Sequence, residues 1–179
     1  TGNTLIMANT TDPAARNVHG TNPQYLIEKI VRMKIYDSMY WKEHCFALNA
    51  ESMVDKAIEL KAVGGTFGGN RKPSNFLCLL LKMLQIQPEK DIIIEYISND
   101  DYKYVRMIGA VYLRLVGRPL DIYHYLEPLL HDYRKIRVRN PDGKYSLTHV
   151  DEIIDALLTE SHYFNITLPR LPARRVLET

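Results

Sequence analysis

The sequence of 179 residues has only two cysteines, Cys45 and Cys78, and no CxxC pair. Two isolated cysteines exclude a disulfide framework, and the lack of repeated Cys or Cys/His pairs excludes zinc fingers and zinc ribbons. Both residues lie within apolar helical patterns. We therefore expect two free, buried thiols and a protein of a reducing compartment.

Long hydrophobic runs are missing as well. The most apolar window, Phe76 to Ile86, is interrupted by Lys82 and is much shorter than the roughly 20 residues that span a bilayer. The brief apolar run from Leu5 to Met7 has no basic segment before it, so it does not fit a secretory signal. These patterns predict a soluble, intracellular protein without a membrane contact.

Glycine, proline and net charge are low too. Nine glycines and nine prolines, beside 46% hydrophobic and 25% charged residues, exclude disorder and collagen for most of the chain. A net charge of +2 is too small for a global nucleic-acid or membrane signal, so electrostatic functions must come from local patches. The length predicts a single domain, which we place at residues 21–179 and expect to be helical. Residues 1–20 show no apolar periodicity, so we expect a flexible N-terminal tail there.

Apolar periodicity predicts an all-α, multi-helix globular domain. A first helix is expected to begin after Thr21 or Asn22, with Pro23 in its first turn. Its expected apolar face consists of Leu26, Ile27, Ile30 and Val31.

Further helices follow along the chain. Asn49 is expected to cap a helix that the Gly64–Gly65 pair ends. Lys72-Pro73 is expected to begin a helix that is apolar nearly all round, which predicts the buried centre of the fold. Helices are also expected at residues 89–97, 101–116, 119–127 and 150–158, with a kink or a new start at Pro128.

One β signal stands out, a small hairpin near residues 136–148. Its turn is the sequence Asn140-Pro141-Asp142-Gly143, between two alternating arms. The residues expected to face inward are Ile136, Val138, Tyr145 and Leu147.

No pattern indicates an active site, so we predict a protein that is not an enzyme and has no cofactor or metal. The glycine-rich loop over residues 64–69 lacks the Lys and Ser/Thr of a Walker loop and is better explained as a tight connection between packed elements. His124, Glu127 and His131 have metal-ligand spacing, but Pro128 interrupts the helix that would align them.

Two surface patterns remain as binding hypotheses. The first is a basic hairpin patch, consisting of Arg134, Lys135, Arg137, Arg139 and Lys144. Such a patch can meet RNA phosphates or an acidic protein segment, and a charged edge strand kept from aggregating is an equally good explanation.

The second pattern is an acidic–aromatic surface, consisting of Glu95, Asp100, Asp101, Tyr102 and Tyr104. Tyrosine is enriched at protein interfaces, and the chain has 12 tyrosines against four phenylalanines. Helix-terminus charge complementarity with packed tyrosines is the alternative explanation. Because Val105 and Ile108 are expected to face the core, only one tyrosine can be fully exposed, and we expect it to be Tyr104.

Several ordered blocks resemble the pre-mRNA-splicing factor 38 family, over about residue 19 to the end. They are His19-Gly20-Thr21-Asn22-Pro23-Gln24-Tyr25-Leu26, the double-glycine loop leading into Phe76-Leu77-Cys78-Leu79, Met83-Leu84-Gln85-Ile86-Gln87-Pro88-Glu89-Lys90-Asp91-Ile92, Asp101-Tyr102-Lys103-Tyr104-Val105-Arg106, Tyr125-Leu126-Glu127-Pro128-Leu129, His149-Val150-Asp151-Glu152 and Leu168-Pro169-Arg170-Leu171.

The resemblance implies a nuclear, α-helical scaffold that is required for spliceosome activation and performs no chemistry. It implies partners among splicing proteins, including microfibrillar-associated protein 1 and a small zinc-finger splicing protein, in the precatalytic complex that holds the tri-snRNP. Animal relatives often carry an Arg/Ser-rich tail, and the sequence ends at Thr179 without one. The resemblance supplies no residue-level contacts.

Two classes of function therefore stand side by side. A monomeric scaffold predicts an exposed aromatic surface and weak contact with RNA. An RNA-binding module using the hairpin from Arg134 to Lys144 predicts a steep salt dependence. The near-zero net charge and the lack of an RRM or KH signature favour the scaffold.

Overall fold

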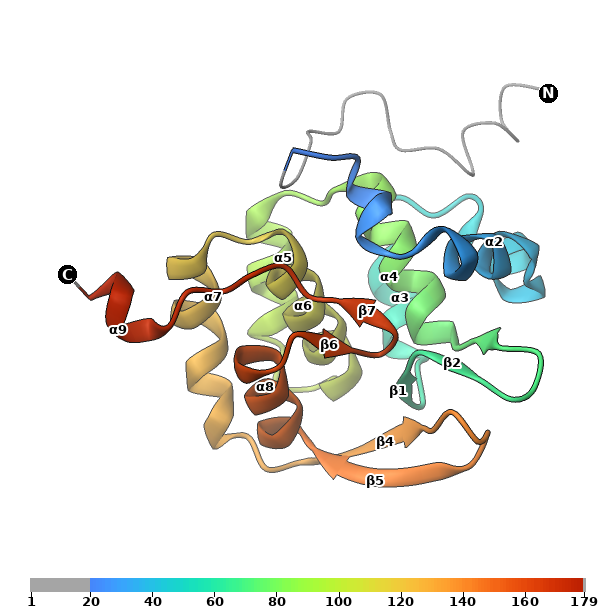
Figure 1. The fold of residues 1–179 in the computed structure, drawn as a ribbon. Helices are drawn as coiled ribbons and strands as arrows, with labels where there is room; N and C mark the ends of the chain where they lie inside the picture. The colour runs from blue at the N-terminus through green and yellow to red at the C-terminus, as the bar shows by residue number, and fades with distance from the viewer. Residues whose placement is uncertain (1–19, 179) are drawn as a thin grey trace.

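Helices dominate the computed structural model, which describes residues 20–178 (Figure 1). The predicted all-α class is thus confirmed. The helices are η1 (Pro23–Leu26), α2 (Lys29–Asp37), η2 (Trp41–Cys45), α3 (Met53–Ile58), α4 (Asn75–Ile86), α5 (Lys90–Ile97), α6 (Lys103–Val116), α7 (Pro119–Leu126), η3 (Glu127–His131), α8 (Val150–Thr159) and α9 (Arg174–Leu177).

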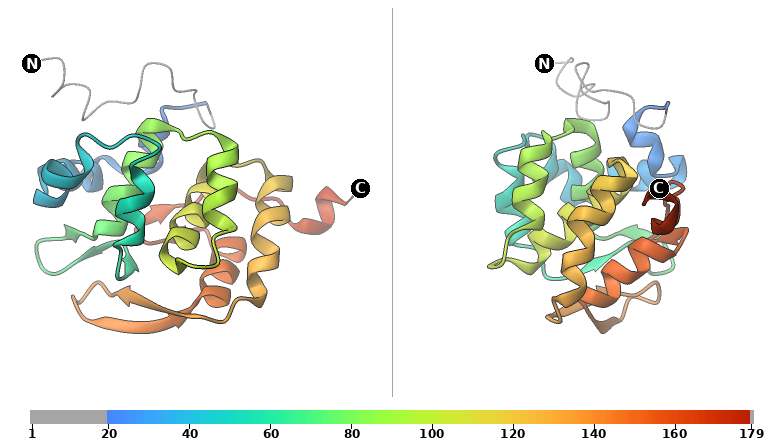
Figure 2. Two further views of the ribbon diagram at one scale, coloured as in Figure 1. Left: turned by 180° about the vertical axis from the view of Figure 1, so that it is seen from behind. Right: turned by 90° about the vertical axis from the view of Figure 1, so that its left-hand side faces the viewer.

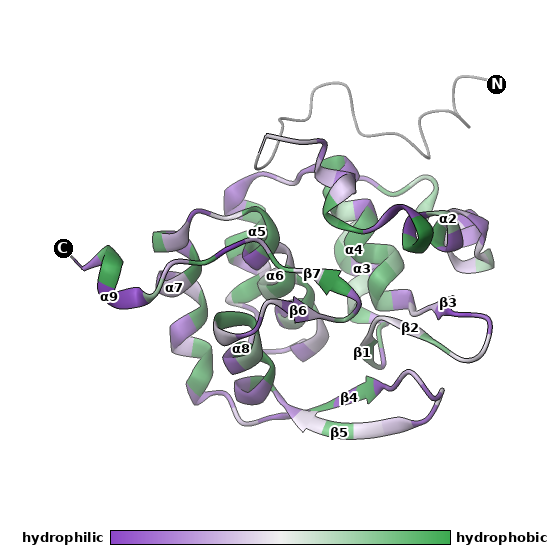
Figure 3. Ribbon diagram, viewed as in Figure 1, coloured by the Kyte–Doolittle hydropathy of each residue, from purple (hydrophilic) through white to green (hydrophobic). Residues whose placement is uncertain are grey.

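Helix α4 occupies the centre of the molecule, as its all-round apolar pattern predicts. Every residue from Phe76 to Gln85 is buried, and Figure 3 shows the helix as largely hydrophobic. The helix begins at Asn75 because Ser74 Oγ accepts a hydrogen bond from Leu77 N at 3.1 Å. The expectation that Lys72-Pro73 begins the helix was wrong, since these two residues form strand β3.

Helices α5, α6 and α8 are present where the sequence predicts helices. Val105, Ile108 and Tyr112 of α6 are buried, as are Ile153 and Leu157 of α8. All three helices contribute to one hydrophobic cluster with α4. Pro128 ends α7 as predicted, and the chain continues as the 3-10 helix η3.

The predicted first helix is divided in two. Asn22 Oδ1 accepts from Gln24 N at 3.0 Å and caps η1, but Ile27 then has an extended backbone and α2 begins only at Lys29. Because of this break Ile30 faces away from the core, and it is 75% exposed. The expected face of Leu26, Ile27, Ile30 and Val31 was therefore wrong at Ile30.

Within residues 20–178, short strands accompany the helices in three small sheets. The largest has the order β1-β4-β5, in which β1 (Val63–Gly64) runs parallel to β4 (Lys135–Arg139), and β4 pairs antiparallel with β5 (Tyr145–His149). β2 (Thr66–Phe67) pairs with β3 (Lys72–Pro73), and β6 (His162–Tyr163) pairs with β7 (Ile166–Thr167). In both views of Figure 2 the orange hairpin lies at the opposite end from blue η1.

The predicted hairpin is present, but the expected inward set was half wrong. Ile136 is buried, whereas Tyr145 and Leu147 are 54% and 59% exposed. The turn closes with Asn140 N donating to Lys144 O, which places Tyr145 opposite Arg139 and Leu147 opposite Arg137. Cross-strand partners share a face, so β5 presents Tyr145 and Leu147 outward with the arginines.

The glycine pair has a packing role and does not end a helix, since α3 already ends at Ile58. Gly64 lies in β1 at φ +156°, and a Cβ there would meet Arg139 O at 2.8 Å. A Cβ on Gly65 would meet Asn165 Oδ1 at 2.2 Å. The close approach of two other segments explains why both positions are glycine.

The predicted flexible tail over residues 1–20 lies outside the described residues, except for Gly20. Within residues 20–178, no helix is long and apolar enough to cross a membrane.

Candidate functional site

The loop between α5 and α6 is held by a buried arginine on α6. Arg106 is 8% exposed, and its Nε donates to Ile97 O at 2.8 Å. Its Nη2 lies 2.7 Å from Asp100 Oδ1, and its Nη1 lies 2.7 Å from Asp132 Oδ2. Arg106 therefore connects the loop to the segment between η3 and β4.

A second arginine completes this clamp. Arg134 Nη2 donates to Asp132 Oδ2 at 2.8 Å, and its Nη1 donates to Asp100 O. Burial alone would raise the pKa of the Asp132 carboxyl, but hydrogen bonds from Arg134 and Arg106 lower that pKa to about 2. The side-chain hydrogen bond with Asp132 in turn raises the pKa of Arg134. Both groups therefore remain charged at neutral pH.

The acidic–aromatic surface lies beside this clamp. Glu95 and Asp101 are exposed, and Asp100 is exposed but ion-paired with Arg106. Tyr102 is 46% exposed. Tyr104 is only half-buried, and its hydroxyl accepts a hydrogen bond from Arg137 N at 3.1 Å. The expectation that Tyr104 is the more exposed tyrosine was wrong, because the hairpin partly covers it.

The basic hairpin patch is divided by its internal contacts. Lys135, Arg137 and Lys144 are exposed, whereas Arg134 belongs to the clamp and Arg139 packs between aromatic rings. Contacts from Arg134 to Asp100 and from Arg137 to Tyr104 bring the two predicted surfaces together. These two contacts join residues of the two predicted surfaces, and no sequence pattern indicated that they touch.

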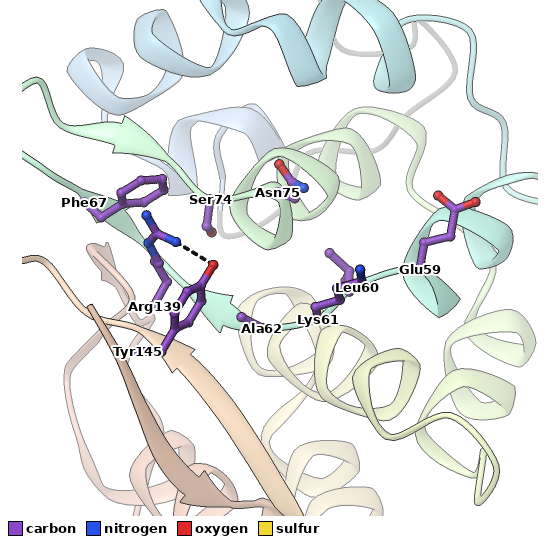
Figure 4. A pocket seen from close by; sticks show the side chains of 9 residues that line it. All are labelled: Glu59, Leu60, Lys61, Ala62, Phe67, Ser74, Asn75, Arg139 and Tyr145. Carbon is purple, nitrogen blue, oxygen red and sulfur yellow. Dashed lines mark hydrogen bonds between the residues drawn. The ribbon is translucent and has the colours of Figure 1, made fainter. Parts of the chain in front are cut away.

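A pocket of about 350 Å³ opens beside the hairpin (Figure 4). The Arg139 guanidinium carbon lies 4.2 Å from the Phe67 ring centroid and 4.5 Å from that of Tyr145, and Arg139 also donates a hydrogen bond to the Tyr145 hydroxyl. The other lining residues are Glu59, Leu60, Lys61, Ala62, Ser74 and Asn75. Stacking on two rings fixes this cation in place at the pocket wall.

Sequence reasoning identified Arg139 as a basic residue and missed the rest of this pocket. Phe67 comes from the glycine-rich loop, Leu60 follows the end of α3, and Asn75 is the first residue of α4. The available signal was Phe67 itself, because a large aromatic ring is unusual in a glycine-rich loop, where it is half-buried in the structure. The pairing of that loop with the hairpin was not readable from the sequence.

Both cysteines are free and buried, as predicted. Burial raises the pKa of both thiols, that of Cys78 to about 12, so they are neutral near pH 7. Across residues 20–178, no group of three His, Cys, Asp or Glu side chains is arranged to hold a metal ion. The described surface presents exposed aromatic, acidic and basic side chains, which suit the binding of a polypeptide segment.

A family model described as "PRP38 family" matches residues 16–179. The chain belongs to the PRP38 family. Its relatives include "Pre-mRNA-splicing factor 38" of Arabidopsis thaliana, 64% identical over 96% of this chain and 48% of the relative, and "Pre-mRNA-splicing factor 38A" of Homo sapiens, 62% identical over 96% and 55%. The resemblance noted from the sequence blocks is thus confirmed. This PRP38 chain spans about half the length of these curated relatives.

A solved structure also resembles the PRP38 chain. It is the "Crystal structure of the Snu23-Prp38-MFAP1(217-258) complex of Chaetomium thermophilum", with a TM-score of 0.85 and 42% identity over 93% of this chain and 86% of that one. The helical fold described above is therefore the fold of a chain solved in a protein complex.

Proposed function

We propose that this chain is a non-enzymatic scaffold of the spliceosome, located in the nucleus, which docks segments of other splicing proteins. Its proposed partners are proteins of the Snu23 and MFAP1 types, and the family resemblance adds a small zinc-finger splicing protein. In this proposal the domain acts as a monomer in the precatalytic complex that holds the tri-snRNP, and it is required for activation of the spliceosome.

One observation carries the proposal. A chain that shares this fold at a TM-score of 0.85 was solved in a complex with Snu23 and a fragment of MFAP1. The fragment, residues 217–258 of MFAP1, is a short segment. Short segments bind through a few anchor side chains, so the receiving surface needs exposed aromatic groups and complementary charge.

The acidic–aromatic surface meets that need and is the proposed docking surface for a basic, helical segment. Tyr102 supplies a rigid, exposed ring, and the exposed carboxylates of Glu95 and Asp101 supply negative charge. Asp100 contributes less to the partner because Arg106 already neutralises it. We therefore assign Tyr102 as the anchor and Tyr104 as a support for the hairpin.

A pull-down from nuclear extract, with and without nuclease, tests the function. The tagged domain should retain Snu23-type and MFAP1-type proteins in both conditions, because the proposed contacts are between proteins. Loss of all splicing proteins after nuclease treatment would show that RNA holds the complex together. In that case RNA binding through the basic hairpin patch would replace scaffolding as the proposed function.

The hairpin patch provides the matched control for that experiment. Lys135, Arg137 and Lys144 are exposed, and replacing all three with Gln removes positive charge without disturbing the clamp. The scaffold predicts weak, salt-sensitive RNA binding that this variant reduces and partner retention that it leaves intact. Loss of the protein partners in the triple variant would contradict the assignment to the acidic–aromatic surface.

A further inference from the structure

Lys82, Arg106 and Arg114 are cations of residues 20–178 that are less than a tenth exposed. Lys82 Nζ donates to Phe46 O at 3.1 Å, and Arg106 has two carboxylate partners. Arg114 is the most deeply buried of the three, at 3% exposure. Its Nε donates to Leu157 O at 2.7 Å, and within the described residues it has no carboxylate partner.

Arg114 also lines a pocket of about 350 Å³, at the end of α8. Leu158, Leu168 and Leu171 supply apolar walls, and Arg170 is an exposed second cation at the pocket. The segment that forms the outer wall is fixed in place, because Leu168 N donates to Ser161 O at 2.8 Å and Tyr123 Oη donates to Pro172 O at 2.8 Å.

A buried guanidinium without a counter-charge is energetically costly, since burial removes water that only a paired anion replaces well. Burial lowers the pKa of Arg114, but an arginine stays charged at neutral pH. One hydrogen bond from Nε leaves the paired Nη donors for a ligand, and their planar geometry matches a carboxylate bidentately. A ligand carboxylate in the pocket would therefore supply the missing counter-charge.

We propose that this pocket binds the carboxylate of an Asp or Glu side chain, flanked by aliphatic residues, on a segment of a partner protein. This inference rests on the proposed scaffold function and assigns it a second docking point, away from the acidic–aromatic surface. The leucine walls suit the aliphatic neighbours of the acidic residue. Exposed Glu160, which also lines the pocket, disfavours a doubly charged phosphate more than a single carboxylate.

The test uses two synthetic peptides that differ at one position, with glutamate or glutamine between two leucines. The side-chain Nε–Hε resonance of Arg114 is followed by NMR while each peptide is added to the wild-type domain. The glutamate peptide should shift this resonance saturably and bind at least about tenfold more tightly than the glutamine peptide. Sodium acetate and inorganic phosphate are titrated as further probes. Phosphate binding as tight as the glutamate peptide would overturn the assignment to a protein carboxylate.

Variants provide an independent readout of the same pocket. Arg114→Gln should lose at least about tenfold in affinity for the glutamate peptide, whereas Glu160→Gln should gain affinity because it removes a like charge. Arg175→Gln is the matched control, since Arg175 is exposed and lies outside the pocket lining. If Arg114→Gln fails to fold, the Glu160→Gln titration and the wild-type titration decide the question.

The two proposals fail in different ways. Equal binding of the two peptides, or tighter binding by wild type than by Glu160→Gln, would overturn the carboxylate pocket. Retention of splicing proteins in the pull-down would leave the scaffold function standing in that case. Loss of those proteins with an intact preference for the glutamate peptide would instead contradict the scaffold and retain the pocket.

Discussion

Arg106 and Arg114 are two buried arginines of one helix whose guanidinium groups have different partners. Both lie on α6, yet only Arg106 is neutralised, by Asp100 and Asp132. Arginines within an apolar pattern were visible in the sequence. Their partners were not, because Asp132 lies 26 positions from Arg106 and its approach depends on how η3 packs.

The clamp predicts how stability depends on pH. The folded pKa of Asp132 is about 2, below its ordinary value of 3.8. A lowered folded pKa stabilises the fold above the unfolded value, and this stabilisation is lost as the pH falls through the folded value. We therefore expect the urea midpoint of the wild-type domain to fall between about pH 4 and pH 2, and Asp132→Asn to have a flatter profile there.

At neutral pH Asp132→Asn should cost roughly 3 kcal/mol, because it leaves buried Arg106 with less counter-charge. Asp101→Asn is the control, since Asp101 is exposed, and it should change stability little. Parallel pH profiles for wild type and Asp132→Asn would show that Asp132 does not carry this effect.

At the scale of elements, the hairpin shows what a pattern can and cannot determine. Its position, its arms and its Asn140-Pro141-Asp142-Gly143 turn were predicted from residue types. Alternation alone could not determine which face of β5 lies inward, because a shift of one residue reverses every side chain. The hydrogen bond between Asn140 N and Lys144 O determines the register, and it places Leu147 outside.

The register has a direct mutational test. Leu147→Glu should change the free energy of unfolding by less than about 0.5 kcal/mol, since the side chain is exposed. Ile136→Ala should cost about 2 to 5 kcal/mol, because it removes buried methyl groups and leaves a cavity. Urea unfolding of both variants measures the difference. A loss in Leu147→Glu comparable to that in Ile136→Ala would mean that β5 packs with the opposite face inward.

The central helix supports a stronger prediction. Leu80 lies in the middle of α4 and is completely buried. Leu80→Asp places an unpaired charge in the core, at a cost of several kcal/mol against a total stability of about 5 to 15 kcal/mol. Differential scanning calorimetry should show no cooperative transition. Lys82→Met provides the comparison, and it should keep a cooperative transition because Met fills the same space without a charge. A cooperative transition of Leu80→Asp near the wild-type melting temperature would show that α4 is not the centre of the core.

At the scale of the whole molecule, the fold joins two surfaces that are separate in the sequence. The acidic–aromatic surface comes from the α5–α6 junction, and the basic hairpin patch comes from β4, β5 and their turn. The clamp of Arg106, Asp132 and Arg134 holds them side by side. The residue types of both were readable from sequence, but their contact depends on packing between distant segments. This contact explains why Tyr102, and not Tyr104, is left exposed.

The docking assignment is tested most directly by calorimetric titration of an MFAP1-type fragment against wild type, Tyr102→Ala and Tyr25→Ala. Tyr25 is 58% exposed on η1, at the other end of the molecule from the hairpin, and serves as the matched control. We expect Tyr102→Ala to weaken binding by more than about 1 kcal/mol, roughly fivefold, and Tyr25→Ala to bind like wild type. Unchanged affinity in Tyr102→Ala, with its circular dichroism spectrum intact, would contradict the assignment of this surface.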